Sequence, residues 1–168
     1  MFKFFYKLKT RIRPGTKILS SKENSKLLIE AAYIQNYAGV LAALETDADV
    51  NIVDRDGRTP LTHAVTDKEF EIVKLLCERG ADVKAKDSSD WTALHFAAQN
   101  YDLDMCKYLV DAGAEVDAVD GNGNTALMRA EFESRGSTDL QDFFISVGAN
   151  FELKNFHGVS TKDLRNSM

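Results

Sequence analysis

The stretch Gly57-Arg58-Thr59-Pro60-Leu61-Thr62-His63-Ala64 decides the architecture of this chain, because closely similar stretches follow it at a fixed interval. The second copy is Asp90-Trp91-Thr92-Ala93-Leu94-His95-Phe96-Ala97, and the third is Gly123-Asn124-Thr125-Ala126-Leu127-Met128-Arg129-Ala130, at the same distance again. A second marker keeps this step at 48–50, 81–83 and 114–116, where Ala is followed by an acidic residue and Val. Two independent markers in one register define an internal repeat.

The repeat resembles the ankyrin repeat, whose period is about 33 residues, as here, and whose signature matches Thr92-Ala93-Leu94-His95-Phe96-Ala97-Ala98. The resemblance covers residues 25–164. It implies an all-α ankyrin-repeat solenoid of helix-turn-helix plus β-hairpin repeats, with about four repeats and a truncated C-terminal cap. A single repeat cannot bury its apolar face, so we expect the repeats to stack around one continuous core.

The composition is that of a globular protein without a membrane span. The 168 residues are 44% hydrophobic, and no apolar run approaches the roughly 18 residues that a membrane helix needs. The N-terminus, Met1-Phe2-Lys3-Phe4-Phe5-Tyr6-Lys7, interrupts its apolar residues with lysines and lacks the features of a signal peptide. We therefore expect a cytoplasmic protein in which Cys77 and Cys106 are buried, reduced thiols.

Charge divides the chain into a basic N-terminal segment, residues 1–24, and an acidic repeat array, residues 25–168. The segment holds seven basic residues against Glu23 alone, a net charge of +6, so the chain's net charge of −5 leaves −11 for the array. An acidic array predicts poor nucleic-acid binding and suits a basic partner protein.

The N-terminal segment has an apolar pattern of its own, which Pro14-Gly15 ends. Phe2, Phe5, Leu8 and Ile12 recur at helical spacing between basic residues. Three interpretations are open: an apolar face that caps the first repeat, a flexible basic tail, or a contact with a membrane surface or nucleic acid.

Local signals predict the ends of the early helices. Ser20 with Glu23 three residues later predicts a capped helix start, and Thr59 followed by Pro60 predicts another. Asp47 replaces the glycine that ends the second helix of later repeats, which marks the first repeat as degenerate. Asp90 likewise replaces a hairpin glycine, which predicts local backbone strain.

The fourth repeat departs from the pattern. Its exit glycine, Gly148, comes two positions later than the period from Gly113 predicts, and 133–138 is the natural place for the insertion. Arg129 and Glu131 stand where earlier repeats have apolar or small residues. We therefore expect this side of the fourth repeat to face solvent in part.

Apparent catalytic and ligand motifs are better explained by the repeat. Gly121–Ala126 matches the glycine-rich turn of dinucleotide folds but lacks the preceding strand. Asp120, Asn122, Asn124 and Glu131 have the spacing of a calcium loop but lack its glycine. No nucleophile, P-loop or zinc-protease motif is present, so we expect no enzyme, cofactor or metal.

The three histidines form no metal-ligand pair in sequence. The resemblance gives His95 a structural role, hydrogen-bonding to the backbone near the hairpin. His63 is expected to be a satisfied core histidine, and His157 to be exposed at a hairpin tip.

In proteins that resemble this one, the concave face and the hairpin tips bind another protein. Trp91, the only tryptophan, is predicted to be an exposed binding residue, with local packing on its neighbouring hairpin as the alternative. The residues carried over to this candidate binding surface are Tyr33, Ile34, Arg55, Asp56, Arg58, Thr66, Asp67, Ser88, Ser89, Trp91, Gln99, Asn100, Asn122, Asn124, Phe132, Glu133, Phe156 and His157.

The resulting hypothesis is a monomeric, non-enzymatic module that binds one partner protein. Small stand-alone chains of this kind resemble the ankyrin-type immunity proteins of bacterial toxin systems, which implies an inhibitor of a basic toxin. The alternatives are a general scaffold or secreted effector adaptor, and a membrane or nucleic-acid tether that uses residues 1–24.

Overall fold

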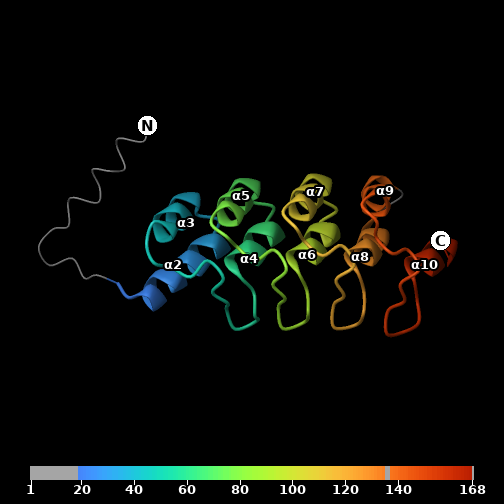
Figure 1. Cartoon of the computed structure of the whole chain (residues 1–168), viewed down its shortest axis with the longest axis horizontal. Coiled ribbons are helices and arrows are strands. Elements are labelled where there is room, and N and C mark those ends of the chain that lie inside the picture. The colour runs from blue at the N-terminus through green and yellow to red at the C-terminus, as the bar shows by residue number, and fades with distance from the viewer. Residues whose placement is uncertain (1–18, 135–136, 168) are drawn as a thin grey trace, which may run out of the picture.

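Two rows of short helices run along the described part of the chain, which comprises residues 19–134 and 137–167 of a computed structural model (Figure 1). The inner row lies next to the projecting hairpins, and the outer row lies on the opposite side of the inner row, away from the hairpins. The inner row contains α2 (Ser21–Tyr33), α4 (Pro60–Thr66), α6 (Ala93–Gln99), α8 (Ala126–Glu133) and α10 (Thr161–Ser167). The outer row contains α3 (Tyr37–Leu44), α5 (Phe70–Glu78), α7 (Leu103–Asp111) and α9 (Asp139–Ser146).

This arrangement confirms the predicted all-α solenoid with helix-turn-helix repeats and a truncated C-terminal unit. The loop between α8 and α9 coincides with the predicted insertion at 133–138. The segment for which a cap, a tail or a tether was considered lies, up to residue 18, outside the described residues. Within them, no helix has the length and apolar character needed to cross a bilayer.

The predicted helix starts are confirmed by their capping bonds. Ser20 and Glu23 form a reciprocal pair, in which the Ser20 N–H donates to Glu23 Oε2 at 2.9 Å. Thr59 Oγ1 accepts from the Thr62 N–H at 3.2 Å, and Pro60 occupies the first turn, where its missing N–H costs nothing. Helices of 7–13 residues are marginal alone, so caps and stacking together stabilise them.

The core repeats with the sequence period. Leu28, Leu61, Leu94 and Leu127 recur at the repeat interval, and each is at most 1% exposed. Val40, Val73 and Cys106 form a second fully buried column at the same step, so Cys106 takes the place of a valine. Each buried leucine contributes about 2 kcal/mol of apolar burial, which no single repeat could obtain without its neighbours.

The prediction of two buried thiols is correct for Cys106 and wrong for Cys77. Both cysteines are free, but Cys77 is only partly buried, on the outer row. Burial raises the pKa of the Cys77 thiol, and it raises the pKa of Cys106 much further, so both thiols stay protonated.

The degenerate first repeat replaces its glycine turn with side-chain bonds. Asp47 does not adopt the left-handed backbone found at Gly80 and Gly113, where φ is +85° and +96°. Instead its carbonyl accepts from Ser21 Oγ at 2.8 Å, and its carboxylate accepts from Asn24 Nδ2 at 2.8 Å. The exit of the first repeat is thereby tied to the start of α2.

The expectation of a solvent-facing fourth repeat is wrong for Glu131. Its side chain is 7% exposed, because α10 packs against α8 and Arg165 Nε donates to Glu131 Oε2 at 3.1 Å. Arg129 is partly buried and pairs with Asp120. Glu131 therefore meets a partner from the next unit, Arg129 pairs with the hairpin of its own repeat, and α10 closes the C-terminal end of the stack.

We expect Arg165→Ala to destabilise the protein by about 2 kcal/mol, because it leaves the buried Glu131 carboxylate unpaired. Urea unfolding followed by circular dichroism measures the loss. The double variant Arg165→Ala/Glu131→Gln removes the charge as well and should recover part of the stability. A double variant no more stable than Arg165→Ala would contradict this role for the pair.

Candidate protein-binding surface

One side-chain oxygen organises each hairpin. In the third hairpin, Asp120 Oδ1 accepts from the backbone N–H groups of Asn122 and Asn124, both at 2.8 Å. The same two bonds, two and four residues ahead, recur in every hairpin at 2.8–3.0 Å. We call the residue that supplies this oxygen the head of the hairpin. The four head residues are Asp54, Asp87, Asp120 and Asn155. A side chain that satisfies two turn amides fixes the loop independently of what the tip residues are.

Backbone bonds then join neighbouring hairpins into a ladder. The Ser88 N–H donates to the Asp56 carbonyl at 2.8 Å, and the Gly121 N–H donates to the Ser89 carbonyl at 2.9 Å. The last hairpin continues the ladder, since the Phe156 N–H donates to the Asn122 carbonyl at 3.0 Å. The tips are therefore held at fixed spacing before any partner arrives, which lowers the entropy cost of binding.

The last turn of each hairpin, just before an inner-row helix, needs a left-handed backbone. Gly57, Gly123 and Gly158 supply it with φ of +75°, +78° and +77°. Asp90 adopts φ of +61° at the same position, which confirms the predicted strain.

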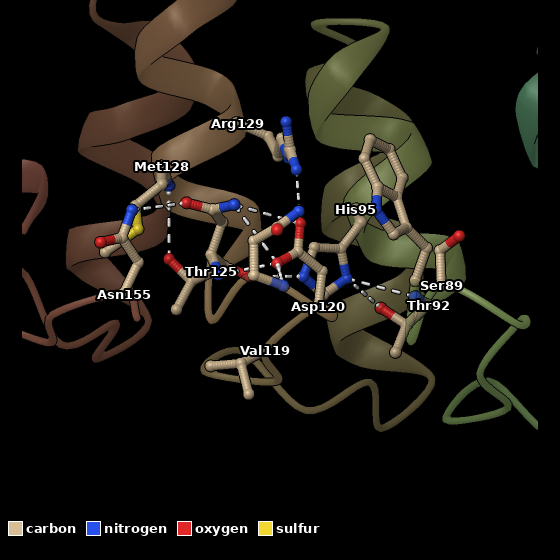
Figure 2. A network of polar contacts seen from close by, with 12 residues as sticks. Ser89, Thr92, His95, Val119, Asp120, Thr125, Met128, Arg129 and Asn155 are labelled. Carbon is tan, nitrogen blue, oxygen red and sulfur yellow. Dashed lines mark hydrogen bonds and ion pairs between the residues drawn. The ribbon is translucent and has the colours of Figure 1, made fainter. Parts of the chain in front are cut away.

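A buried polar network links the third hairpin to the last one (Figure 2). Asp120 also accepts from Asn124 Nδ2 and from Arg129 Nη2, and its side chain has no exposed surface. Asn155 Nδ2 donates to Asn124 Oδ1 at 2.9 Å. Burial alone raises the pKa of Asp120, but the bonds from Arg129, Asn124 and Asn122 outweigh it and hold the pKa below its usual value.

The same network explains the apparent calcium-loop spacing. The Asp120 carboxylate is occupied by hydrogen-bond donors of its own chain, and Glu131 turns to Arg165 instead. Within the described residues, no group of three or more His, Cys, Asp or Glu side chains is placed to hold a metal ion.

His95 has the structural role that the resemblance implied. It is fully buried, and its Nε2 donates to the Asn124 carbonyl of the next repeat at 3.0 Å. Its Nδ1 accepts from the Thr92 N–H at 3.2 Å and lies 2.9 Å from Thr92 Oγ1. These partners require the neutral ring with its proton on Nε2, because a protonated Nδ1 would face the Thr92 N–H. Burial lowers the pKa of His95, opposed in part by the Asn124 carbonyl.

The other two histidines also lie as predicted. His63 is buried, and its Nε2 lies 2.8 Å from Asp54 Oδ2. His157 is exposed at the last hairpin tip.

The candidate residues lie at the hairpin tips and at the C-terminal ends of α2, α4, α6 and α8, a set that we call the hairpin side, and they differ in exposure. Phe156 is 74% exposed and Tyr33 65%. The exposed members are Tyr33, Ile34, Arg55, Asp56, Asp67, Ser88, Ser89, Gln99, Asn122, Phe132, Phe156 and His157. The partly buried members are Arg58, Thr66, Trp91, Asn100 and Glu133.

Two candidates have structural duties that remove them from the surface or limit their part in it. The prediction that Asn124 belongs to the binding surface is wrong, because its side chain is buried and bridges Asp120 and Asn155. Asn100 Nδ2 donates to the carbonyls of Val65 and Thr66, at 3.2 and 3.0 Å, and so clamps the end of α4 to α6.

Trp91 is not the freely exposed side chain predicted from the sequence. It lies within a stack, with the Phe96 ring centroid at 4.8 Å and the Arg129 guanidinium 4.5 Å from the indole centroid. Arg58 extends the stack over Phe96 at 5.0 Å. Trp91 therefore packs locally, but on side chains of α6 and α8 rather than on a neighbouring hairpin, and it is a partly exposed member of an arginine–aromatic stack.

Val53 belongs to this side and was not predicted. It is 54% exposed directly before the head residue Asp54. The signal available in sequence was the repeat alignment, since residues 53, 86 and 119 are Val, Lys and Val at equivalent places.

Two family models match this chain. A model of ankyrin repeats in many copies matches residues 41–97, and a model of three ankyrin repeats matches residues 84–155. Together they cover most of the stack, from α3 to the last hairpin. The comparison with curated proteins gave no match.

We expect Asp120→Ala to cost about 3 kcal/mol of unfolding free energy, because it strands Arg129 and two turn amides. Asp120→Asn is the matched variant, since the chain already uses Asn155 at this position. It keeps the turn acceptor and loses only the ion pair, so its loss in urea unfolding should be smaller. Equal losses would contradict the head-position role.

His95 should make stability fall with acidification from about pH 6.5. Its folded pKa is lowered, so the unfolded chain binds the proton first, and stability drops by about 1 kcal/mol per pH unit below the unfolded value. His95→Gln should be less stable at pH 7.5 but lack this drop between pH 6.5 and 5.5. Parallel pH profiles in urea unfolding would refute the assignment.

Proposed function

Because the chain belongs to the ankyrin-repeat family, whose members typically bind other proteins and catalyse nothing, we propose that it binds a partner protein through its hairpin side. The surface consists of the exposed hairpin tips and the C-terminal ends of α2, α4, α6 and α8. Its members are the exposed and partly buried candidates described above, with Val53 added and with Asn124 and Ile34 removed, because Ile34 lines an apolar groove of the first repeat.

One observation carries this proposal: the hairpins share one scaffold but carry different tips. The head oxygen and the ladder bond backbone groups, so neither depends on the side chains of the two exposed tip residues that follow each head. Those tip pairs are Arg55-Asp56, Ser88-Ser89, Gly121-Asn122 and Phe156-His157. A rigid scaffold with free choice of exposed side chains is the arrangement that recognition surfaces use.

Aromatic side chains support the same conclusion. Phe156 is largely exposed, yet its ring lies so close to Gly123 that a Cβ there would come within 2.8 Å of it. Tyr33 is also exposed, and its ring meets His63 edge to face at a centroid distance of 5.4 Å. Exposed aromatic rings held in place supply contact area at low entropy cost, as binding hot spots do.

The partner we propose is basic. Exposed carboxylates on the hairpins outnumber exposed cations, in keeping with the net charge of −11 over residues 25–168. The exposed carboxylates are Asp49, Asp56, Asp82, Asp90, Glu115, Asp117 and Glu152, and the exposed cations are Arg55, Lys84, Lys86 and Lys154. Complementary charge accelerates association and makes it sensitive to salt.

Within this function, we favour an inhibitor that covers the working face of a basic protein. A rigid, preformed surface suits occlusion, because it loses little freedom on binding. The resemblance to immunity proteins supports this role by analogy alone, and an adaptor remains the alternative. The free thiols are in keeping with a reducing compartment such as the cytoplasm, where we place a monomeric chain.

The proposal is tested by using the tagged full-length chain to capture its partner protein from a lysate of the source organism. Phe156→Ser should weaken retention of a stoichiometric partner by roughly 10-fold. Ile145→Ser is the matched control, because Ile145 is 42% exposed on the outer helix α9. Trp91→Ala is unsuitable, since it would break the arginine–aromatic stack.

Equal retention by Phe156→Ser and wild type, with loss in Ile145→Ser, would move the site to the outer row and refute the proposal. Once a partner is in hand, its own activity is measured with one equivalent of this chain. Lost activity supports inhibition, and unchanged activity in the complex supports the adaptor.

A further inference from the structure

The first repeat carries an apolar groove on the side that faces away from the stack. The groove has a volume of about 430 Å³ and lies between α2 and α3. Its apolar lining includes Leu19, Leu27, Ala31, Ile34 and Ala42. Leu27 is 47% exposed and Ile34 64%, so this face has no cover among the described residues.

Equivalent positions are covered inside the stack. Leu27 corresponds to Pro60 and Ala42 to Leu75, one repeat later, and both Pro60 and Leu75 are buried. The other end of the stack is closed, because α10 packs on α8 and Arg165 reaches Glu131. A stacked array requires a cover at both ends, since a terminal unit otherwise exposes its stacking face.

We propose that residues 2–12 of the same chain fold back as a helix and fill this groove. The chain enters the groove directly, because Leu19 is one of its lining residues. Pro14-Gly15 provides the reversal just before that point. Phe2, Phe5, Leu8 and Ile12 then form one apolar helix face, the complement of an apolar groove.

Length and charge fit this occupant. An 11-residue helix is about 16 Å long, between the lengths of about 12 and 20 Å for α3 and α2, which have 8 and 13 residues. Residues 1–18 contain six basic residues and no acidic one, while Glu30 lines the groove and the array is acidic. The segment therefore presents apolar side chains to the groove and cations to a negative surface.

This inference does not depend on partner binding at the hairpin side. It assigns the basic segment to the fold, so that the segment completes the array at the end opposite α10. It also gives the segment's apolar side chains a site within the molecule, where a tail or a tether would leave them in water or lipid.

A double-variant cycle in the full-length chain tests the contact. Leu8→Ala and Leu27→Ala should each lower the Tm by about 3 °C, because each removes buried apolar surface. The double variant should lower the Tm by clearly less than the sum, since the two side chains share one contact. Lys7→Ala is the control in the segment, because helical spacing places Lys7 opposite the apolar face.

Ile145→Ala is the control on the array, as an exposed apolar side chain far from the groove. Leu8→Ala and Leu27→Ala that behave like these controls would overturn the proposal, and so would strictly additive losses. Analytical ultracentrifugation of wild type and of Leu27→Ala tests whether a second copy of the chain fills the groove. A dimer in wild type that is lost in Leu27→Ala would mean that the groove is filled between chains. Binding to phosphatidylcholine–phosphatidylserine vesicles that Leu8→Ala abolishes, without a change in Tm, would establish the tether instead.

Discussion

The structure depends on one hydrogen-bonding device: a side-chain oxygen that accepts two backbone amides at the head of each hairpin. Asp54, Asp87, Asp120 and Asn155 all provide it. Turn amides left unsatisfied next to a stacked core would cost more than the folded state of a small repeat can supply. Because the acceptor is a side chain rather than a second strand, the hairpin can project beyond the helices and still keep one conformation.

The ladder of backbone bonds converts these separate turns into a single surface. Its consequence is a division of labour along each repeat. Buried columns such as Leu28 to Leu127 set the spacing of units, and the head residues and the ladder fix the turns through backbone groups, so neither depends on the tip side chains. Phe156 and Arg55 can therefore differ from their counterparts in other repeats at little cost to stability, which is what a recognition surface requires.

The two ends of the stack follow the same physics with different means. At the C-terminal end, α10 supplies Arg165 to a carboxylate that would otherwise be buried without a partner. At the N-terminal end, Asp47 is hydrogen-bonded to Ser21 and Asn24 in place of a glycine turn. The apolar groove between α2 and α3 has no cover among the described residues. Each end of a linear array exposes a stacking face, so in an array of few repeats a large share of the residues serves to cover the ends.

The sequence by itself determined the period, the helix starts at Ser20 and Thr59, the strained turn at Asp90, the insertion after α8 and the role of His95. The helix starts and the strained turn rest on contacts within a repeat, and the period and the insertion follow from its recurrence and from the departure from it, all of which are visible along the chain. The role of His95, which includes a bond to the Asn124 carbonyl of the next repeat, came from the family resemblance. Only the tertiary structure decided that Glu131 is buried, that Trp91 is stacked under Arg129, and that Asn124 bridges two hairpins. Each of these depends on a side chain from the next unit of the stack. The period predicts that two such positions are neighbours, but the geometry of packing decides whether their side chains meet.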